Sequence, residues 1–196
     1  MICYGYNNND IKSRIMKAVF LDRDGTINVE EPNYLTDIRK LKIFDEAFKA
    51  IQLFNCHGFK TIVVTNQSCV GRGVLQEKEL IKINTQLQKT LAKKNAHLDS
   101  IYYCPHTPDD QCLCRKPKIG LLQRAVQEHH VNLEKSFFIG DREFDIYAGK
   151  AAGCKTVLVL TGAGKQMLER FSLKPDFIAT HLLEAAQWVI QQSASL

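Results

Sequence analysis

Four short polar stretches of this 196-residue chain contain the residue types that handle phosphate groups and metal ions. They are DRDGT with Asp22 and Asp24, TNQS with Thr65, CRKP with Lys116, and GDREFD with Asp141 and Asp145. Carboxylates gathered in a half-buried cleft repel one another unless a hard cation joins them, and Mg²⁺ is commonly held by one or two carboxylates plus substrate phosphate. Each aspartate alone could instead cap a turn or a helix. The full set in this order predicts a magnesium-dependent site for a phosphate ester.

A second cluster of reactive side chains lies between residues 104 and 114. Cys104, His106, Cys112 and Cys114 follow the pattern C-x-H, five residues, C-x-C. Four such ligands leave no open coordination position, which favours a closed, tetrahedral structural Zn²⁺ over a catalytic one. Free cysteines in a loop are the alternative. We predict a zinc loop that fixes where the two cations directly after it, Arg115 and Lys116, are directed.

The elements that carry these residues are predicted by apolar runs of strand length. Such runs cover residues 17–22, 60–65, 100–104, 136–140 and 155–160, with helix-like stretches around 45–56, 76–95, 118–130, 144–152 and 182–192. Strands and helices that alternate in this way predict an α/β fold, a doubly wound parallel sheet with helices on both faces. Because ligands bind at the carboxyl ends of such strands, the polar stretches after the strands are expected to converge.

Composition limits the remaining possibilities. With 45% apolar residues, the chain can form one sizeable core, so we expect an N-terminal extension at 1–16 and a single domain at 17–196, with no room for a large cap domain. No apolar run reaches the roughly 18 residues of a membrane span, and the N-terminus lacks a secretory signal pattern. Seven cysteines, mostly scattered, favour a reduced, cytosolic protein. The net charge of +5 fits either a polyanion site or an ordinary surface.

The four polar stretches match, in order, the four motifs of the haloacid dehalogenase superfamily of phosphotransferases, across roughly residues 17 to 162. More narrowly, FLDRDGTIN, VVTNQS, YYCPH and CLCRKPK resemble the bacterial D-glycero-D-manno-heptose 1,7-bisphosphate 7-phosphatases. The histidinol-phosphatases of histidine biosynthesis are somewhat less similar. The resemblance implies a Rossmann-like fold and Mg²⁺-dependent removal of the 7-phosphate, a step toward the ADP- or GDP-heptose of lipopolysaccharide or S-layer synthesis. The alternative is hydrolysis of histidinol phosphate.

The resemblance also implies a role for each site residue. Asp22 would be the nucleophile that forms an aspartyl-phosphate, Asp24 the general acid and then base, and Thr65 and Lys116 the residues that hold the phosphoryl oxygens. The implied Mg²⁺ ligands are Asp22, Asp24 and Asp141, with Asp145 orienting groups around the metal. The implied substrate-binding residues are Tyr34, Asn66, Gln67, Ser68, Arg115 and Arg142.

The chain departs from the heptose enzymes in a few places. The loop INVEEPNYLTD is about one residue longer, Cys69 replaces a glycine, and Arg142 replaces a frequent lysine. GDREFDI leans toward the histidinol-phosphatases, whereas DRDGTIN and Arg72–Gly73 lean toward the heptose enzymes. Basic residues are spread along the chain instead of forming a stripe with aromatic residues, so nucleic acid is not an expected partner. We expect a monomer that acts on a small sugar phosphate and does not contact membranes.

Overall fold

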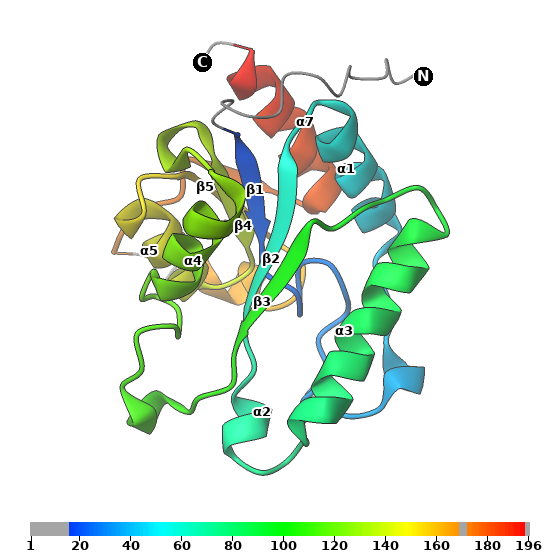
Figure 1. Cartoon of the computed structure of the whole chain (residues 1–196). Coiled ribbons are helices and arrows are strands. Elements are labelled where there is room, and N and C mark those ends of the chain that lie inside the picture. The colour runs from blue at the N-terminus through cyan, green and yellow to red at the C-terminus, as the bar shows by residue number, and fades with distance from the viewer. Residues whose placement is uncertain (1–15, 169–171, 195–196) are drawn as a thin grey trace.

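The computed structural model describes residues 16–168 and 172–194, and these form a six-stranded parallel sheet in the order β3-β2-β1-β4-β5-β6 (Figure 1). The predicted α/β doubly wound fold is confirmed. The predicted extension at residues 1–16 lies outside the described residues except for Met16, whose backbone N–H donates to the His130 carbonyl. The strands are β1 (Ala18–Leu21), β2 (Lys60–Asn66), β3 (Ser100–Cys104), β4 (Phe137–Gly140), β5 (Lys155–Val159) and β6 (Phe177–Ala179).

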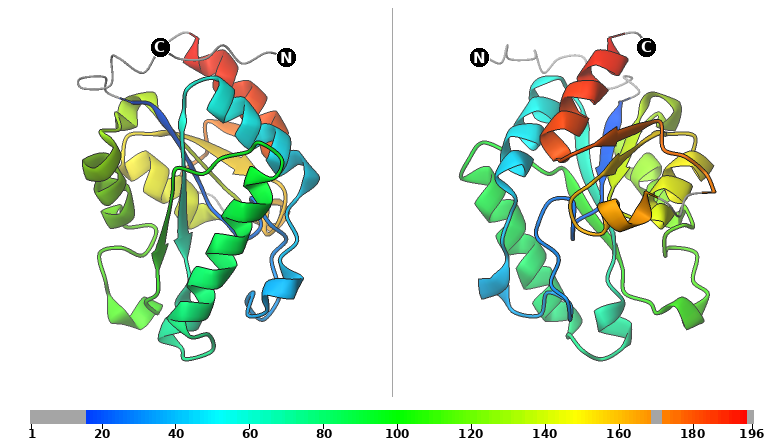
Figure 2. Two further views of the ribbon diagram at one scale, coloured as in Figure 1. Left: turned by 45° about the vertical axis from the view of Figure 1, so that its right-hand side comes forward. Right: turned by 180° about the vertical axis from the view of Figure 1, so that it is seen from behind.

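Helices cover both faces of this sheet, as Figure 2 shows from two sides. Strand side chains alternate between the faces, so Val19 and Leu21 of β1 join one core while Ala18 and Phe20 join the other. Both sets are fully buried, which explains why the strands are apolar throughout. The first face is covered by α1 (Asp45–Cys56) and α7 (Leu182–Ser193), with part of α3 (Glu77–Ala92), and the second by α4 (Gly120–His129) and α5 (Glu143–Ala151).

The elements that the sequence did not predict are short. They are β6, the one-turn helices α2 (Ser68–Gly71) and α6 (Gly164–Met167), and the 3₁₀ turns η2 (Ile38–Lys40), η3 (Pro108–Asp110) and η4 (Leu133–Lys135). Three or four residues are too few to display a periodic pattern. Trp188 of α7 stacks on Phe177 with ring centroids 5.1 Å apart, so it serves the packing of α7 against the sheet.

The sheet places the polar motifs together at the carboxyl ends of its strands. β1 lies between β2 and β4, and the chain runs outward from it in both directions, so a crevice forms where the carboxyl ends of these strands meet. In the described residues, the segments after β1, β2 and β3 are loops and helices and none forms a cap domain. None of the helices in the described ranges is long and apolar enough to cross a membrane.

Candidate active site

The centre of the crevice is a contact between Asp22 and Lys116, both almost fully buried. The Lys116 ammonium donates to Asp22 Oδ1 at 2.7 Å and to the Val64 carbonyl at 2.7 Å, and Asp145 Oδ1 lies 2.6 Å away. The contacts with Asp22 and Val64 are hydrogen bonds and use two of its three protons, whereas the contact with Asp145 is an ion pair. Burial alone would lower the pKa of Lys116, but the carboxylates of Asp145 and Asp22 raise it above its ordinary value. The lysine is therefore a fixed positive charge beside Asp22.

Three carboxylates gather at the same place. Oxygens of Asp22, Asp141 and Asp145 all lie within 4.8 Å of one another. Burial, together with the charges of Asp22 and Asp145, raises the pKa of Asp141 to about 8. Burial raises that of Asp145 to about 7 although Lys116 opposes the shift. When all three carboxylates are ionised, they and the Lys116 ammonium carry a net charge of −2, so this set of oxygens fits a divalent, oxygen-seeking cation such as Mg²⁺.

Close backbone approach holds Asp141 in this cluster. A Cβ atom at Gly25 would lie 2.4 Å from Asp141 Oδ2, and one at Gly162 would lie 2.3 Å from it, so only glycine fits at either position. The Ala163 backbone N–H donates to the same oxygen at 2.8 Å. Turns after β1 and β5 thus enclose the carboxylate.

The Asp24 carboxylate lies outside this cluster, although the sequence predicted it as a Mg²⁺ ligand. Its oxygens accept from Arg23 Nη2 at 2.8 Å, Asn28 Nδ2 at 2.9 Å and Gln67 Nε2 at 2.8 Å. Burial would raise the pKa of Asp24, but the Arg23 charge and the hydrogen bonds from these three residues lower it. The side chain is 22% exposed and lines the pocket. Asp145 belongs to the carboxylate cluster, whereas these donors hold the Asp24 carboxylate, and a role for Asp24 in metal binding stays a prediction.

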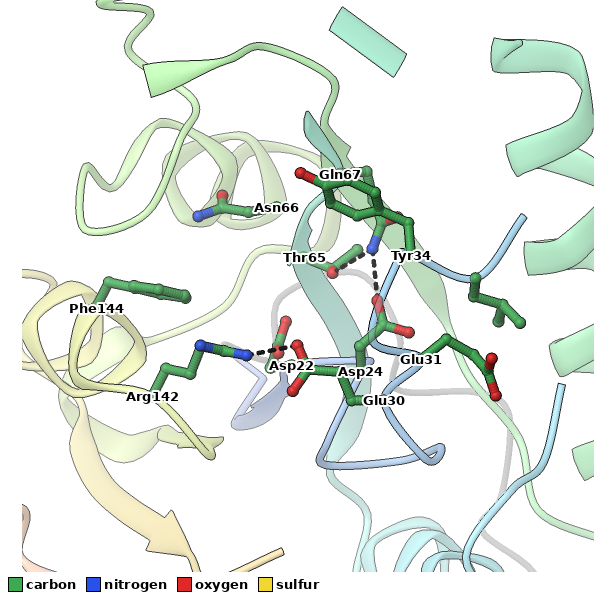
Figure 3. A pocket seen from close by; sticks show the side chains of 11 residues that line it. Asp22, Asp24, Glu30, Glu31, Tyr34, Thr65, Asn66, Gln67, Arg142 and Phe144 are labelled. Atoms are coloured by element: carbon green, nitrogen blue, oxygen red, sulfur yellow. Dashed lines mark hydrogen bonds and ion pairs between the residues drawn. The ribbon is translucent and has the colours of Figure 1, made fainter. Parts of the chain in front are cut away.

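The end of β2 connects these groups. The Gln67 side-chain amide donates both to Asp24 and, at 3.0 Å, to Thr65 Oγ1 (Figure 3). Asn66 pairs with the backbone of Lys116, donating to its carbonyl at 3.2 Å and accepting from its N–H at 3.0 Å. Ser68 begins α2 and is buried, but it is not among the residues that line the pocket.

A pocket opens in front of Asp22 and Asp24 (Figure 3). Arg142, the residue before α5, forms an ion pair across it with Glu30 of the loop after β1. Burial would lower the pKa of Arg142, but the Glu30 carboxylate raises it. Arg115 does not line the pocket, because its guanidinium donates to the His106 carbonyl at 3.2 Å. The lining residues are Asp22, Asp24, Glu30, Glu31, Tyr34, Leu35, Thr65, Asn66, Gln67, Arg142 and Phe144.

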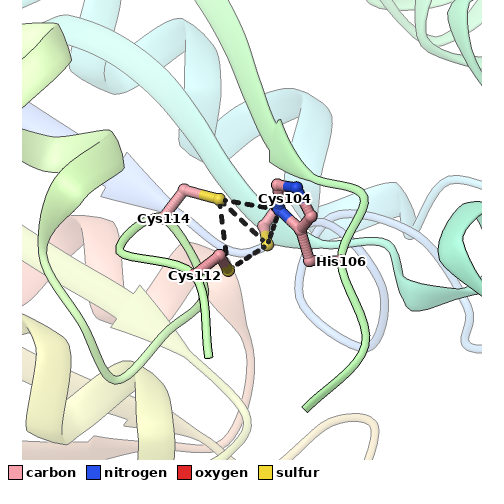
Figure 4. Close-up of side chains that lie close together, drawn as sticks. All are labelled: Cys104, His106, Cys112 and Cys114. Atoms are coloured by element: carbon pink, nitrogen blue, oxygen red, sulfur yellow. Dashed lines mark hydrogen bonds between the residues drawn. The ribbon is translucent and has the colours of Figure 1, made fainter. Parts of the chain in front are cut away.

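Cys104, His106, Cys112 and Cys114 come together in the loop after β3 (Figure 4). Cys114 Sγ lies 3.2 Å from His106 Nδ1, 3.2 Å from Cys104 Sγ and 3.4 Å from Cys112 Sγ. A zinc tetrahedron with bonds of about 2.3 Å has edges of about 3.8 Å, so these atoms are spaced nearly as a metal would hold them. The cluster is therefore able to hold a metal ion.

The loop that carries this cluster is hydrogen-bonded to the segment that follows the carboxyl end of β2. The carbonyl of Cys104 accepts from the Gln67 backbone N–H at 2.7 Å, and the carbonyl of Pro105 accepts from Gly71 at 2.9 Å. Only Arg115 separates Cys114 from Lys116, whose backbone Asn66 holds. Order in the loop thus determines where the Lys116 side chain starts.

Comparison with known proteins agrees with this geometry. A family model described as HAD-hydrolase-like matches residues 113–185. The D-glycero-beta-D-manno-heptose-1,7-bisphosphate 7-phosphatase of Pasteurella multocida is 39% identical over 153 residues, covering 74% of this chain and 83% of that protein. The Haemophilus ducreyi protein of the same name is 34% identical over 180 residues, covering 88% of this chain and 98% of that protein. The chain belongs to the haloacid dehalogenase (HAD) family of phosphatases.

A solved HAD structure extends the match to three dimensions. The D,D-heptose 1,7-bisphosphate phosphatase of B. bronchiseptica, crystallised with magnesium and phosphate, superimposes with a TM-score of 0.85 at 30% identity. The match covers 90% of this chain and 99% of that one. The fold that carries the carboxylate cluster is therefore the fold of a HAD phosphatase.

Sequence reasoning missed several residues around this HAD site. No role was assigned from the sequence to Arg23, Asn28 or Phe144, although all three stand within its motifs. None was assigned to Asn84 either, which lies in a predicted helix. One signal was present in the sequence: Asn84 shares the buried stripe of α3 with Leu80, Ile83, Leu87 and Leu91. A polar residue at a core position needs a partner, and here that partner is Arg23.

Proposed function

We propose that this enzyme removes the 7-phosphate of D-glycero-D-manno-heptose 1,7-bisphosphate through an aspartyl-phosphate on Asp22. The names of its relatives support the substrate class. The observation that carries the chemistry is the buried Lys116 ammonium at 2.7 Å from Asp22, beside the carboxylates of Asp141 and Asp145. An anionic nucleophile can attack an anionic phosphate only where such positive charge neutralises the repulsion.

In the first step, the Asp22 carboxylate attacks phosphorus and the bond from phosphorus to the sugar oxygen breaks. Asp24 protonates the departing alkoxide, while Lys116 and Thr65 hold the phosphoryl oxygens. A phosphate dianion beside Asp24 opposes its negative charge and raises its affinity for this proton. In the second step, Asp24 takes a proton from water as that water attacks phosphorus, which releases inorganic phosphate and restores Asp22.

We assign Mg²⁺ to Asp22, Asp141 and Asp145, since their oxygens form the buried cluster. When bound, the ion would neutralise charge on the phosphate and on the carboxylates. Asp24 lies outside this set because Arg23, Asn28 and Gln67 hold its carboxylate. We assign Zn²⁺ in a structural role to the Cys/His cluster, because three thiols and an imidazole complete a tetrahedron.

Substrate recognition is assigned to the rim of the pocket. Tyr34 and Arg142 line it, and Arg142 provides a cation for the second phosphate once Glu30 releases it. Asn66 and Gln67 line the pocket as well. Ser68 and Arg115, which do not line it, complete the proposed set. A sugar bisphosphate carries charges that do not cross a bilayer unaided, so we expect the enzyme to act in the cytosol, as a monomer with no nucleic-acid or membrane partner.

Phosphate release from heptose 1,7-bisphosphate and from histidinol phosphate, each with Mg²⁺, tests the assignment. We expect kcat/KM to favour the heptose bisphosphate by about a hundredfold or more, which is the scale of a lost charged contact. Phosphorus NMR of the product should show heptose 1-phosphate. Preference for histidinol phosphate, or release of the 1-phosphate, would contradict the proposal.

A further inference from the structure

The guanidinium group of Arg23 is buried directly behind Asp24. Arg23 is 0% exposed, and it does not line the pocket. Its Nε and Nη2 atoms donate to the two oxygens of Asp24 at 3.3 and 2.8 Å, and Nη2 also donates to Gln67 Oε1 at 3.0 Å. A planar guanidinium that contacts both oxygens of a carboxylate fixes its orientation as well as its charge. Arg23 therefore determines how the Asp24 carboxylate is turned.

Arg23 is itself anchored by a residue remote from the pocket. Its Nη1 donates to Asn84 Oδ1 at 2.8 Å, across 61 residues of sequence. Asn84 lies on the buried face of α3, and within the described part of the chain its Nδ2 has no hydrogen-bond partner. An unpaired buried amide destabilises a fold, and leucine would suit this stripe better. Packing does not account for Asn84, whereas its bond to Arg23 does.

We propose that Arg23, anchored by Asn84, is a positioning residue that holds the Asp24 carboxylate in the orientation needed for proton transfer to the leaving alkoxide. Three residues then share this work: Arg23 orients both oxygens from behind, Asn28 donates to one oxygen, and Gln67 connects the other to Thr65. The hydrogen bonds of the Arg23 side chain go to Asp24, Asn84 and Gln67, none of which belongs to the carboxylate cluster. The inference rests on the proposed role of Asp24 as the general acid.

Leaving-group dependence separates this role from a purely structural one. A sugar alkoxide must be protonated as it departs, whereas 4-nitrophenolate departs without a proton. The parameter kcat/KM reports the steps up to the first irreversible one, which is loss of the leaving group, so later hydrolysis of the aspartyl-phosphate does not mask the difference. Loss of correct Asp24 orientation should therefore lower kcat/KM for the sugar phosphate and largely spare the aryl phosphate.

The experiment measures kcat/KM on heptose 1,7-bisphosphate and on 4-nitrophenyl phosphate at saturating Mg²⁺. We expect Arg23→Met to lose about a hundredfold on the sugar and under about threefold on the aryl ester, the scale of a displaced catalytic group. Arg23→Lys keeps the positive charge but cannot contact both Asp24 oxygens as the guanidinium does. Its kcat/KM on the sugar should lie between those of Arg23→Met and wild type. Asn84→Ala leaves the Arg23–Asp24 pair in place, so its kcat/KM on the sugar should fall by about tenfold. The aryl phosphate should again be largely spared, and this difference between the two substrates is called the split. Gln88→Ala, one turn along α3 and exposed, is the matched control and should behave as wild type.

Equal losses on both substrates, or none, from Arg23→Met and Asn84→Ala would overturn the inference. If Arg23→Met does not fold, as judged by circular dichroism, the Asn84→Ala split decides. Asp24→Asn identifies which idea fails. If Asp24→Asn itself shows no split, the proposed role of Asp24 is wrong and the inference falls with it. If Asp24→Asn shows the split and the Arg23 and Asn84 variants do not, only the inference is wrong.

Discussion

Lys116 Nζ lies 2.7 Å from Asp22 Oδ1, although 94 residues separate the two in the sequence. The contact depends on two segments that converge: β1, which ends one residue before Asp22, and the Cys/His loop, whose last cysteine lies two residues before Lys116. Both side chains are buried, so neither can shift far without disturbing the carboxylate cluster. One ion pair thus joins the proposed nucleophile to the cation proposed to bind the phosphate.

Lys116→Ala should lower kcat by about 10²- to 10³-fold on heptose bisphosphate and on 4-nitrophenyl phosphate alike. The substitution removes the positive charge proposed to stabilise the phosphoryl group, which both substrates share. Steady-state kinetics on both substrates measures this. Lys89→Ala on the exposed face of α3 is a suitable control. If Lys116→Ala changed only KM, Lys116 would have no role in the chemical step.

Asp145→Asn should raise the Mg²⁺ concentration for half-maximal activity by about 10- to 100-fold. The change lowers the negative charge of the cluster by one and takes away an oxygen that lies with those of Asp22 and Asp141. Titration of activity with Mg²⁺ measures the effect, with Glu143→Gln in the first turn of the same helix as the control. An unchanged Mg²⁺ requirement would mean that Asp145 serves only Lys116.

Removal of Mg²⁺ should make stability depend on pH between 6 and 8. The pKa of Asp141 is raised by burial and nearby carboxylates from 3.8 to about 8. The folded protein therefore binds a proton that the unfolded chain has lost, and stability falls as pH rises through this range. Asp145, whose pKa is raised to about 7, contributes in the same direction, whereas Asp24 and Asp176 have lowered pKa values and do not titrate there.

In EDTA, we expect the melting temperature to drop by about 5 °C or more from pH 6 to pH 8. Excess Mg²⁺ should cancel most of this drop, because the cation takes the place of the proton. Differential scanning fluorimetry measures both curves, and Asp141→Asn should make the EDTA curve less steep, with Asp145 accounting for the slope that remains. A melting temperature that rises with pH in EDTA would contradict the assigned direction.

Cys112→Ser should release zinc and lower kcat/KM by about a hundredfold, and added Mg²⁺ should not restore it. The substitution weakens one of four ligands in a loop with no core of its own, and Lys116 then loses its position. Elemental analysis and activity are measured on the same samples. Cys154→Ala, which replaces a buried cysteine outside the cluster, should keep both zinc and activity. A zinc-free Cys112→Ser enzyme with full activity would separate the loop from catalysis.

Much of the fold was predictable because its strands are buried on both faces and therefore read as unbroken apolar runs. The five longer strands and the five longer helices were found within a few residues of their observed bounds. β6 has only three residues, and one of them is exposed, so it carries no clear pattern. It is recognisable only by its pairing with β5, which is a tertiary contact.

The site divides in the same way. Asp22, Lys116 and Asp141 follow strands and were found by type and order. The spacing of residues in the sequence does not determine where their side chains point. Asp22 and Asp24 are two residues apart, yet Arg23 and Gln67 hold Asp24 outside the carboxylate cluster, to which Asp145 belongs. Asn84 contributes from the middle of α3 only because that helix packs near the segment that follows β1. Such contacts appear only when the whole chain is folded.

Phosphate release from heptose 1,7-bisphosphate by the wild-type enzyme and by Asp22→Asn, with Mg²⁺ present, tests the central claim most directly. The amide is nearly isosteric with the carboxylate but cannot form the aspartyl-phosphate, so we predict an intact fold by circular dichroism and a loss of about 10³-fold or more in kcat. Wild-type enzyme should release the 7-phosphate alone. A folded Asp22→Asn enzyme that kept a tenth of the wild-type rate, a level at which roughly 1.4 kcal/mol would be the whole contribution of the carboxylate, would contradict the account.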